Sequence, residues 1–248
     1  MIPRIVLALM LAMVAVTPAA AEEIVVALTD STPNFSMRDA NGSTTGINVE
    51  LAALLCSRMQ VQCTFKPMPL VALIAQVRDG KAHIGFANLI KTPEREQVML
   101  FSRPYWRSST AFVGPSRLAG TPLETLLQGR KVAVQEGSRQ ANWLKTQFGD
   151  QVEIIALPTI SDIAAALAQQ QAELALAPMM TLYPFLLSPA GGSFGFVSAP
   201  IDPGWPVHVV VTKTRPELLR RLDRALEEVK HDGSLGRITR SYVPFDIF

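Results

Sequence analysis

Short apolar runs alternate with amphipathic helical patterns along most of this chain, and this alternation constrains its fold more than any other feature. Such runs are typical of buried strands, and the patterns between them are typical of helices that cover a sheet. Their order predicts an α/β architecture with largely parallel strands. The expected strands are Ile24–Leu28, Val61–Phe65, His83–Ala87, Lys131–Gln135, Val152–Ala156, Glu173–Ala177 and Val207–Val211, and the expected helices between them are Val49–Met59, Leu70–Asp79, Arg139–Phe148 and Ser161–Gln171.

The last helix has its own start and stop signals. Thr214 and Glu217 have the spacing of a capping box, Pro216 suits the first helical turn, and Gly233 can end the helix. An apolar stripe between these signals predicts a long helix that packs in the core.

Two stretches that contain Pro or Gly, Ser108–Ser116 and Ser198–Trp205, are expected to cross between two halves of the molecule. Two crossings predict a discontinuous lobe 1, residues 22–110 and 201–248, and a continuous lobe 2, residues 111–200. Ligands of such folds bind in the cleft where strand ends and helix N-termini meet.

Residues 1–21 have the organisation of a cleaved signal peptide. Arg4 precedes an apolar stretch, Ile5–Val16, and the segment ends in the small residues Ala19–Ala21. The apolar stretch is shorter than the roughly 20 residues that a membrane-spanning helix needs, and an uncleaved anchor is the alternative. We predict an exported, periplasmic protein that begins at Glu22.

Composition narrows the classes of function that the chain can have. The 23 Lys and Arg against 21 Asp and Glu give no support to binding of nucleic acid or of a membrane surface. Cys56 and Cys63 lie in the exported part, where a close pair more often forms a disulfide than a metal site. The three histidines are not clustered, and no catalytic signature is present. We therefore expect a disulfide, no metal, no cofactor and no enzyme activity.

The segment Thr92-Pro93-Glu94-Arg95 follows an expected strand and has the features of a helix start. Thr92 can cap the helix, and Pro93 suits its first position. Free backbone N–H groups there favour an anion, and the planar guanidinium of Arg95 can hold a carboxylate through two hydrogen bonds. A capped surface helix with a solvated arginine is the alternative.

A second helix start of this kind is Gly137-Ser138-Arg139, after the strand Lys131–Gln135. Glycine allows close approach of the backbone to a ligand, and Ser138 can cap the helix or donate from its hydroxyl. An ordinary strand–turn–helix connection is the alternative. One such start in each half favours an anion site between the halves.

Several motifs resemble the extracellular solute-binding proteins of family 3, the receptors of polar amino-acid ABC importers. Gly46-Ile47-Asn48-Val49-Glu50-Leu51 is similar to their Gly-Phe-Asp-Val-Asp-Leu segment, and the segment from Cys56 to Cys63 is similar to the disulfide segment of the lysine/arginine/ornithine and histidine binders. Further matches are Leu73-Ile74, Gly80-Lys81, Thr92-Pro93-Glu94-Arg95, Phe101-Ser102, Pro104-Tyr105, Gly129-Arg130-Lys131-Val132-Ala133-Val134, Gly137-Ser138 and Asp232-Gly233-Ser234.

The resemblance implies a type II periplasmic-binding-protein-like fold, with two α/β lobes, a two-crossing hinge and a ligand cleft between them. It also implies a monomer that delivers a small molecule to a membrane ABC permease. Arg95 matches the arginine that binds the ligand carboxylate, and Ser138 and Gly137 match contacts from the second lobe. Leu70 or Thr32 stands at the cleft position of an aromatic residue that stacks on the ligand.

Other positions depart from the family pattern. Arg139 stands where the family usually has Ser or Thr, and Pro178 stands where an aspartate usually pairs with the ligand α-ammonium. Ala87, Asn88 and Ile90 correspond to serines that usually lie between the strand and the arginine. These changes remove a partner for an ammonium and add a cation.

An α-ammonium buried without a carboxylate partner would be costly. We therefore hypothesise that the ligand is a carboxylate or dicarboxylate without the usual amino-acid head group, held by Arg95 and Arg139. In the alternative, Arg139 points to solvent and Asp30, Glu173 or Asp162 supplies the missing carboxylate.

The expected function is that of a periplasmic substrate-binding protein of an ABC importer that captures a small carboxylate-bearing solute by hinge closure. Two other functions stay open. One is a periplasmic enzyme of the same fold that resembles cyclohexadienyl dehydratase, with Glu173 and Glu136 as candidate acids. The other is a ligand-binding partner of a membrane sensor.

Overall fold

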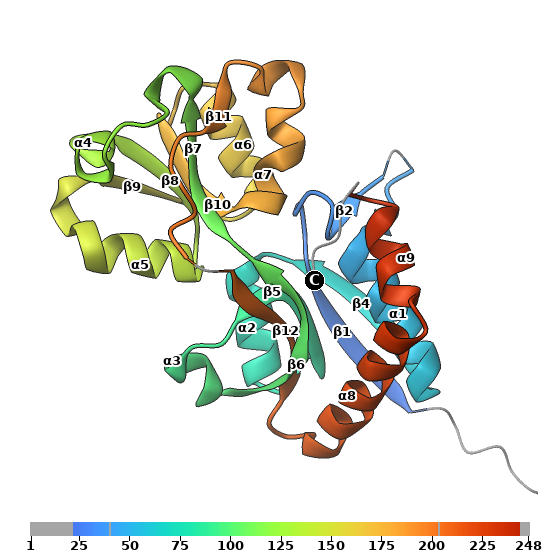
Figure 1. Cartoon of the computed structure of the whole chain (residues 1–248). Coiled ribbons are helices and arrows are strands. Elements are labelled where there is room, and N and C mark those ends of the chain that lie inside the picture. The colour runs from blue at the N-terminus through green and yellow to red at the C-terminus, as the bar shows by residue number, and fades with distance from the viewer. Residues whose placement is uncertain (1–21, 40, 203, 244–248) are drawn as a thin grey trace, which may run out of the picture.

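The computed structural model describes residues 22–39, 41–202 and 204–243, so the predicted signal peptide lies outside the described residues. These residues form two lobes, each built on its own five-stranded sheet (Figure 1). The predicted α/β architecture with two lobes is confirmed. Within the described ranges, no helix combines the length and the apolar character that a membrane crossing requires.

Lobe 1 is built on a sheet of strand order β4-β1-β5-β12-β6. β1 pairs in parallel with β4 and β5, whereas β12 runs antiparallel to β5 and β6. The strands are β1 (Glu23–Thr29), β4 (Gln62–Met68), β5 (Ile84–Ile90), β6 (Met99–Ser108) and β12 (Trp205–Thr212), with a hairpin of β2 (Met37–Arg38) and β3 (Thr44–Thr45). The helices are α1 (Ile47–Met59), α2 (Leu70–Arg78), α3 (Pro93–Glu96), α8 (Pro216–His231) and α9 (Ser234–Arg240).

The apolar run of β1 explains why helices cover both faces of this sheet. Ile24, Val26 and Leu28 pack with α1, α8 and α9, whereas Val25 and Ala27 pack with α2 on the other face (Figure 1). Side chains alternate across a strand, so a continuous apolar run requires cover on both sides.

Lobe 2 is built on a sheet of strand order β11-β7-β10-β8-β9. β8 pairs in parallel with β9 and β10, and β7 runs antiparallel to β10 and β11. The strands are β7 (Thr110–Pro115), β8 (Lys131–Gln135), β9 (Glu153–Leu157), β10 (Leu174–Pro178) and β11 (Phe194–Phe196). The helices are α4 (Leu123–Leu127), α5 (Arg139–Phe148), α6 (Ile160–Ala168) and α7 (Met179–Leu186), with 3₁₀ turns at Ser116–Leu118, Gly149–Gln151 and Pro189–Gly191.

The chain passes from lobe 1 to lobe 2 at Ser109, between β6 and β7, and returns between β11 and β12 (Figure 1). Two strands were not predicted. β6 is an edge strand with exposed Arg103 and Pro104, which interrupt its apolar pattern, and β7 falls within the segment Ser108–Ser116 that was expected to cross between the lobes. The division into residues 22–110 with 201–248 and residues 111–200 stays a prediction.

The predicted cap of α8 is wrong. The Thr214 hydroxyl contacts the Thr212 hydroxyl at 3.1 Å, and Glu217 accepts from the side chain of Arg215 at 2.8 Å. Arg215 takes the N-cap position, and its side chain accepts no capping hydrogen bond from the backbone of the helix. The spacing of a capping box was present, but competing local partners hold both side chains. Pro216 begins the helix as predicted, and the helix ends at His231, two residues before Gly233.

A disulfide joins Cys56 of α1 to Cys63 of β4, as predicted. The two residues are seven positions apart, so the bridge closes a short loop within lobe 1. We expect its reduction, or the double change to serine, to lower the free energy of unfolding by about 2–3 kcal/mol. At about 2–4 °C per kcal/mol for a chain of this size, scanning calorimetry should show a Tm lower by several degrees. An unchanged Tm in reductant would contradict a stabilising role.

Candidate ligand-binding site

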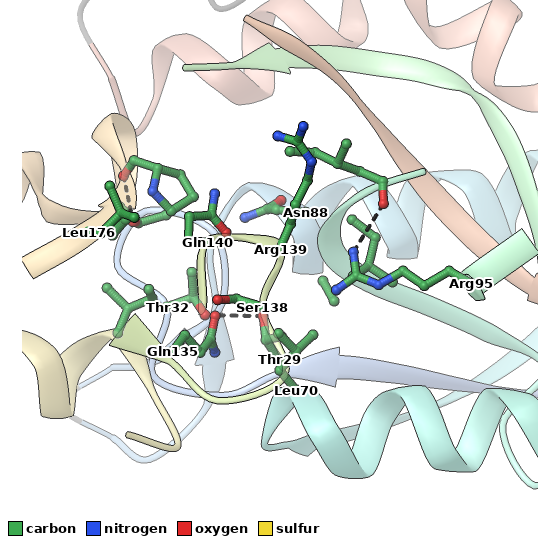
Figure 2. Close-up of a pocket in the computed structure, with 17 residues that line it drawn as sticks. Thr29, Thr32, Leu70, Asn88, Arg95, Gln135, Ser138, Arg139, Gln140 and Leu176 are labelled. Atoms are coloured by element: carbon green, nitrogen blue, oxygen red, sulfur yellow. Dashed lines mark hydrogen bonds between the residues drawn. The ribbon is translucent and has the colours of Figure 1, made fainter. Parts of the chain in front are cut away.

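A pocket lies between the two lobes, at the ends of strands from both sheets (Figure 2). Lobe 1 contributes residues of β1, α2 and β5 together with Arg95, and lobe 2 contributes residues of β8, α5, α6, β10 and α7. Of the predicted ligand contacts, those that line this pocket are Arg95, Ser138, Arg139, Asn88, Leu70 and Pro178; the alternative position Thr32 also lines it.

Arg95 is positioned by a short capped helix and by the end of a strand. The Thr92 hydroxyl accepts a hydrogen bond from the Arg95 backbone N–H at 3.4 Å, so the predicted cap is confirmed. The guanidinium donates from Nη1 to the Ile90 carbonyl at 3.0 Å (Figure 2) and from Nη2 to the Gly137 carbonyl of lobe 2 at 3.0 Å. This side chain therefore lies in the pocket and links the two lobes.

The electrostatics around Arg95 favour an anion. Burial, together with the nearby charge of Arg139, lowers the pKa of Arg95 to about 10, while Glu94 opposes the shift. The guanidinium stays protonated at neutral pH, but its hydrogen bonds go to neutral carbonyl groups. A partly buried cation of this kind gains most from a ligand that brings a negative charge.

The start of α5 shapes the second-lobe side of the site. The Ser138 hydroxyl accepts from the Ala141 N–H at 3.0 Å, so its predicted capping role is confirmed. Gly137 has φ +69°, and a Cβ built on it would lie 2.9 Å from Cγ2 of Val71 in lobe 1. Only glycine allows the lobes to approach this closely here.

Other hydrogen bonds also hold the lobes together. The backbone N–H and the hydroxyl of Ser161 both donate to the Ser31 carbonyl, at 3.1 and 3.0 Å. Across the same interface, the amide of Asn34 reaches the Met180 carbonyl at 3.5 Å. The two lobes are therefore in direct contact on both sides of the pocket.

Arg139 lines the pocket and also covers an aromatic ring. Its guanidinium carbon lies 4.2 Å from the ring centroid of Trp205, the first residue of β12. The alternative in which Arg139 points only to solvent is therefore wrong. A stacked arginine at this place contacts the segment that returns to lobe 1.

We expect the stack to stabilise the protein by about 0.5–2 kcal/mol. A double-mutant cycle of Arg139→Ala and Trp205→Leu, measured by denaturant unfolding, should return a coupling of that size. Additive effects of the two changes would contradict an interaction between them.

Two predicted contacts do not line the pocket. Gly137 lies in the turn before α5, outside the set of residues that line the pocket. Its carbonyl accepts a hydrogen bond from Arg95, which does line the pocket. The backbone N–H of Asp30 bonds to the Met68 carbonyl, and the residue contributes no side of the pocket. The Oδ1 atom of Asp30 is buried and has no hydrogen-bond partner among the described residues. Its role as a ligand contact stays a prediction.

The other carboxylates considered are also elsewhere. Glu173 pairs with Arg130 at 2.6 Å, and Asp162 forms a capping box with Thr159. Glu136 is likewise not among the residues that line the pocket. In the part of the chain that the structure describes, no Asp or Glu lines this pocket, and no cluster of side chains suits a metal ion.

Several polar residues of the pocket were not predicted from the sequence. Gln140 follows the predicted Arg139 directly and donates to the Thr110 hydroxyl at 3.0 Å, and its position in the first turn of α5 could have revealed it. The other missed polar residues are Thr29, Gln135 and Thr181. Their signal was weak, because each is a neutral polar residue at a strand end or helix start and none forms part of a recognisable motif.

Two α/β lobes, two connections and a pocket between the lobes define the class of type II periplasmic-binding-protein-like folds. The match to a family model narrows this class. The chain belongs to the bacterial extracellular solute-binding proteins, family 3, whose model matches residues 24–245. The family indicated by the sequence motifs is therefore confirmed.

Known proteins from this family show how far the likeness extends. The chain is 27% identical to the lysine/arginine/ornithine-binding periplasmic protein of Escherichia coli over 86% of this chain and 85% of that protein. It is 29% identical to a putative ABC transporter arginine-binding protein 2 of the same species, over 95% and 96%. An ancestral arginine-binding protein bound to arginine superposes with a TM-score of 0.82 at 25% identity, over 89% of this chain and 97% of that one. These proteins are named for binding rather than for catalysis.

Proposed function

We propose that the protein is a periplasmic receptor of an ABC importer, and that it captures a small carboxylate-bearing solute that lacks the usual α-ammonium group. The observation that carries this proposal is Arg95, a cation in a pocket without a described carboxylate. The names of the relatives support the periplasmic location and the ABC transporter as partner. The protein acts as a monomer in this proposal.

The ligand would act by favouring the closed form. Arg95 offers further N–H groups beside the two that bond to Ile90 and Gly137, so it can hold a ligand carboxylate while it links the lobes. A ligand that contacts both lobes shifts the equilibrium between the open and closed forms. The closed surface is then the one that the permease recognises.

The absence of an acidic side chain among the described pocket residues supports a ligand without an ammonium head group. An amino acid brings an ammonium that would lie near Arg95 and Arg139 without a carboxylate to pair with. Such an unpaired charge costs several kcal/mol, which removes most of the affinity. A dicarboxylate or another organic acid has no such cost. This pocket therefore differs in charge from one suited to a basic amino acid.

A thermal-shift screen of the mature protein tests this proposal. The ligands should include amino acids, dicarboxylates and aromatic acids, with succinate and L-aspartate, and glutarate and L-glutamate, as matched pairs. An acid at about 1,000 times its Kd stabilises by roughly 4 kcal/mol, which raises Tm by about 10 °C. We expect shifts with acids that lack an amino group. A shift confined to lysine, arginine or histidine would overturn the proposal.

A further inference from the structure

Asn88 is a neutral residue of the pocket, and two residues from other elements hold its side chain. It lies near the end of β5 with φ +52°, a conformation that Asn adopts more readily than most residues (Figure 2). Its Oδ1 accepts from the amide of Asn48 in α1 at 3.2 Å. The hydroxyl of Tyr105 in β6 lies 2.8 Å from both Asn88 Oδ1 and Asn48 Oδ1 and shares its single proton between these two acceptors. Three elements of lobe 1 therefore meet at one carboxamide.

The hydrogen bonds of this cluster fix which way the Asn88 amide faces. Turning Asn88 alone would set its NH₂ against the NH₂ of Asn48, so that two donors face each other. If both amides turned, the NH₂ groups of Asn48 and Asn88 would both donate to the Tyr105 hydroxyl oxygen. The hydroxyl proton would then lose its two acceptors, the side-chain oxygens of Asn48 and Asn88. Asn48 and Tyr105 are buried, so an unmade bond there is costly.

Tyr105 remains a donor throughout the physiological range. Burial raises the pKa of its phenol, so the hydroxyl keeps its proton. Because the Asn88 oxygen is occupied by Asn48 and Tyr105, the group that Asn88 can offer a ligand is its NH₂.

We propose that Asn48 and Tyr105 are positioning residues that make Asn88 a hydrogen-bond donor toward the ligand. The ligand atom opposite Asn88 is then an acceptor, such as a carboxylate, carbonyl or hydroxyl oxygen, and an ammonium is disfavoured there. This inference rests on the proposed function and extends it, because it adds a second selection against an amino group, independent of Pro178.

The decisive change is Asn88→Asp, which keeps the shape and the oxygen that Asn48 and Tyr105 contact but replaces the NH₂ by an acceptor with a negative charge. Calorimetric titration of the two matched pairs gives a ratio of Kd values for each amino acid and its deaminated partner. We expect the Kd of the amino acid, divided by that of its deaminated partner, to fall at least tenfold. A ratio unchanged from the wild type would overturn the proposal.

Tyr105→Phe separates positioning from a structural role. It removes the hydroxyl with little change in volume. The amides of Asn48 and Asn88 can then turn together, which keeps a hydrogen bond between them, and Asn88 can offer its oxygen. We expect the same ratio to move at least threefold toward the amino acid. Equal weakening of both ligands of a pair would show a purely structural role and overturn the positioning role.

A readout without ligand tests the orientation alone. In NMR spectra of the ligand-free protein, the side-chain amide signals of Asn88 and Asn48 are assigned by their loss in Asn88→Asp and Asn48→Asp. The Asn88 NH₂ should exchange quickly with solvent, and the Asn48 NH₂ should exchange slowly. Slow exchange at Asn88 would overturn the cluster, whatever binds. If the wild type bound L-aspartate and L-glutamate more tightly than succinate and glutarate while Asn88 exchanged fast, the orientation would stand, whereas the proposed function and the ligand rule would both be overturned.

Discussion

Replacing Arg95 with alanine is expected to remove most ligand binding, with a loss of about 2–5 kcal/mol. This loss corresponds to a Kd raised roughly thirtyfold to several thousandfold. In the proposed complex, the variant leaves the ligand carboxylate without its cation. It also removes the hydrogen bond to the Gly137 carbonyl across the lobes. Calorimetric titration with the best acid of the screen measures the loss.

Two variants make this test specific. Arg95→Lys keeps the charge but loses the planar fork, so it should recover only part of the affinity. Arg103→Ala is the matched control, because Arg103 is an exposed arginine of β6 whose side chain is 3.6 Å from Glu227. Arg103→Ala should bind as the wild type does. A wild-type Kd in Arg95→Ala would remove Arg95 from the site.

Replacing Pro178 with aspartate is expected to convert the receptor toward amino acids. Pro178 lines the pocket at the N-cap of α7, a position where aspartate is favoured. The new carboxylate would supply the missing partner for an ammonium. We expect at least a tenfold gain in affinity for L-glutamate, about 1.4 kcal/mol, measured by calorimetric titration.

Pro178→Ala is the control for this change, because it removes the ring without adding a charge. A gain in the aspartate variant alone would assign the effect to the carboxylate. Equal gains in both variants would assign it to the lost ring. If neither variant bound L-glutamate better, the missing carboxylate would not be what excludes the ammonium.

Local sequence patterns predicted much of the fold and part of the candidate site. The helix starts at Thr92 and Ser138 were predictable because each cap involves an N–H only three residues away. The strands of the sheet interiors were predictable because burial on both faces requires a continuous apolar run.

The remaining features depend on contacts between distant residues. Arg139 stacks on Trp205, and Asn88 bonds to Asn48, 40 residues away. No local pattern encodes such partners. The sequence also leaves open which way a loop residue turns, and for that reason Asp30 was placed in the pocket although it does not line it.

The close contact between Gly137 and Val71 has a consequence for how such receptors diverge. The apparent Kd of a receptor depends on the fraction of molecules that can close, as well as on the contacts made to the ligand. A larger residue at either position would crowd this contact and lower the fraction of molecules with the lobes together. In the proposed receptor, that change would raise the solute concentration needed for binding. Related bacteria could thus adapt to richer or poorer surroundings while the chemistry of recognition stays the same.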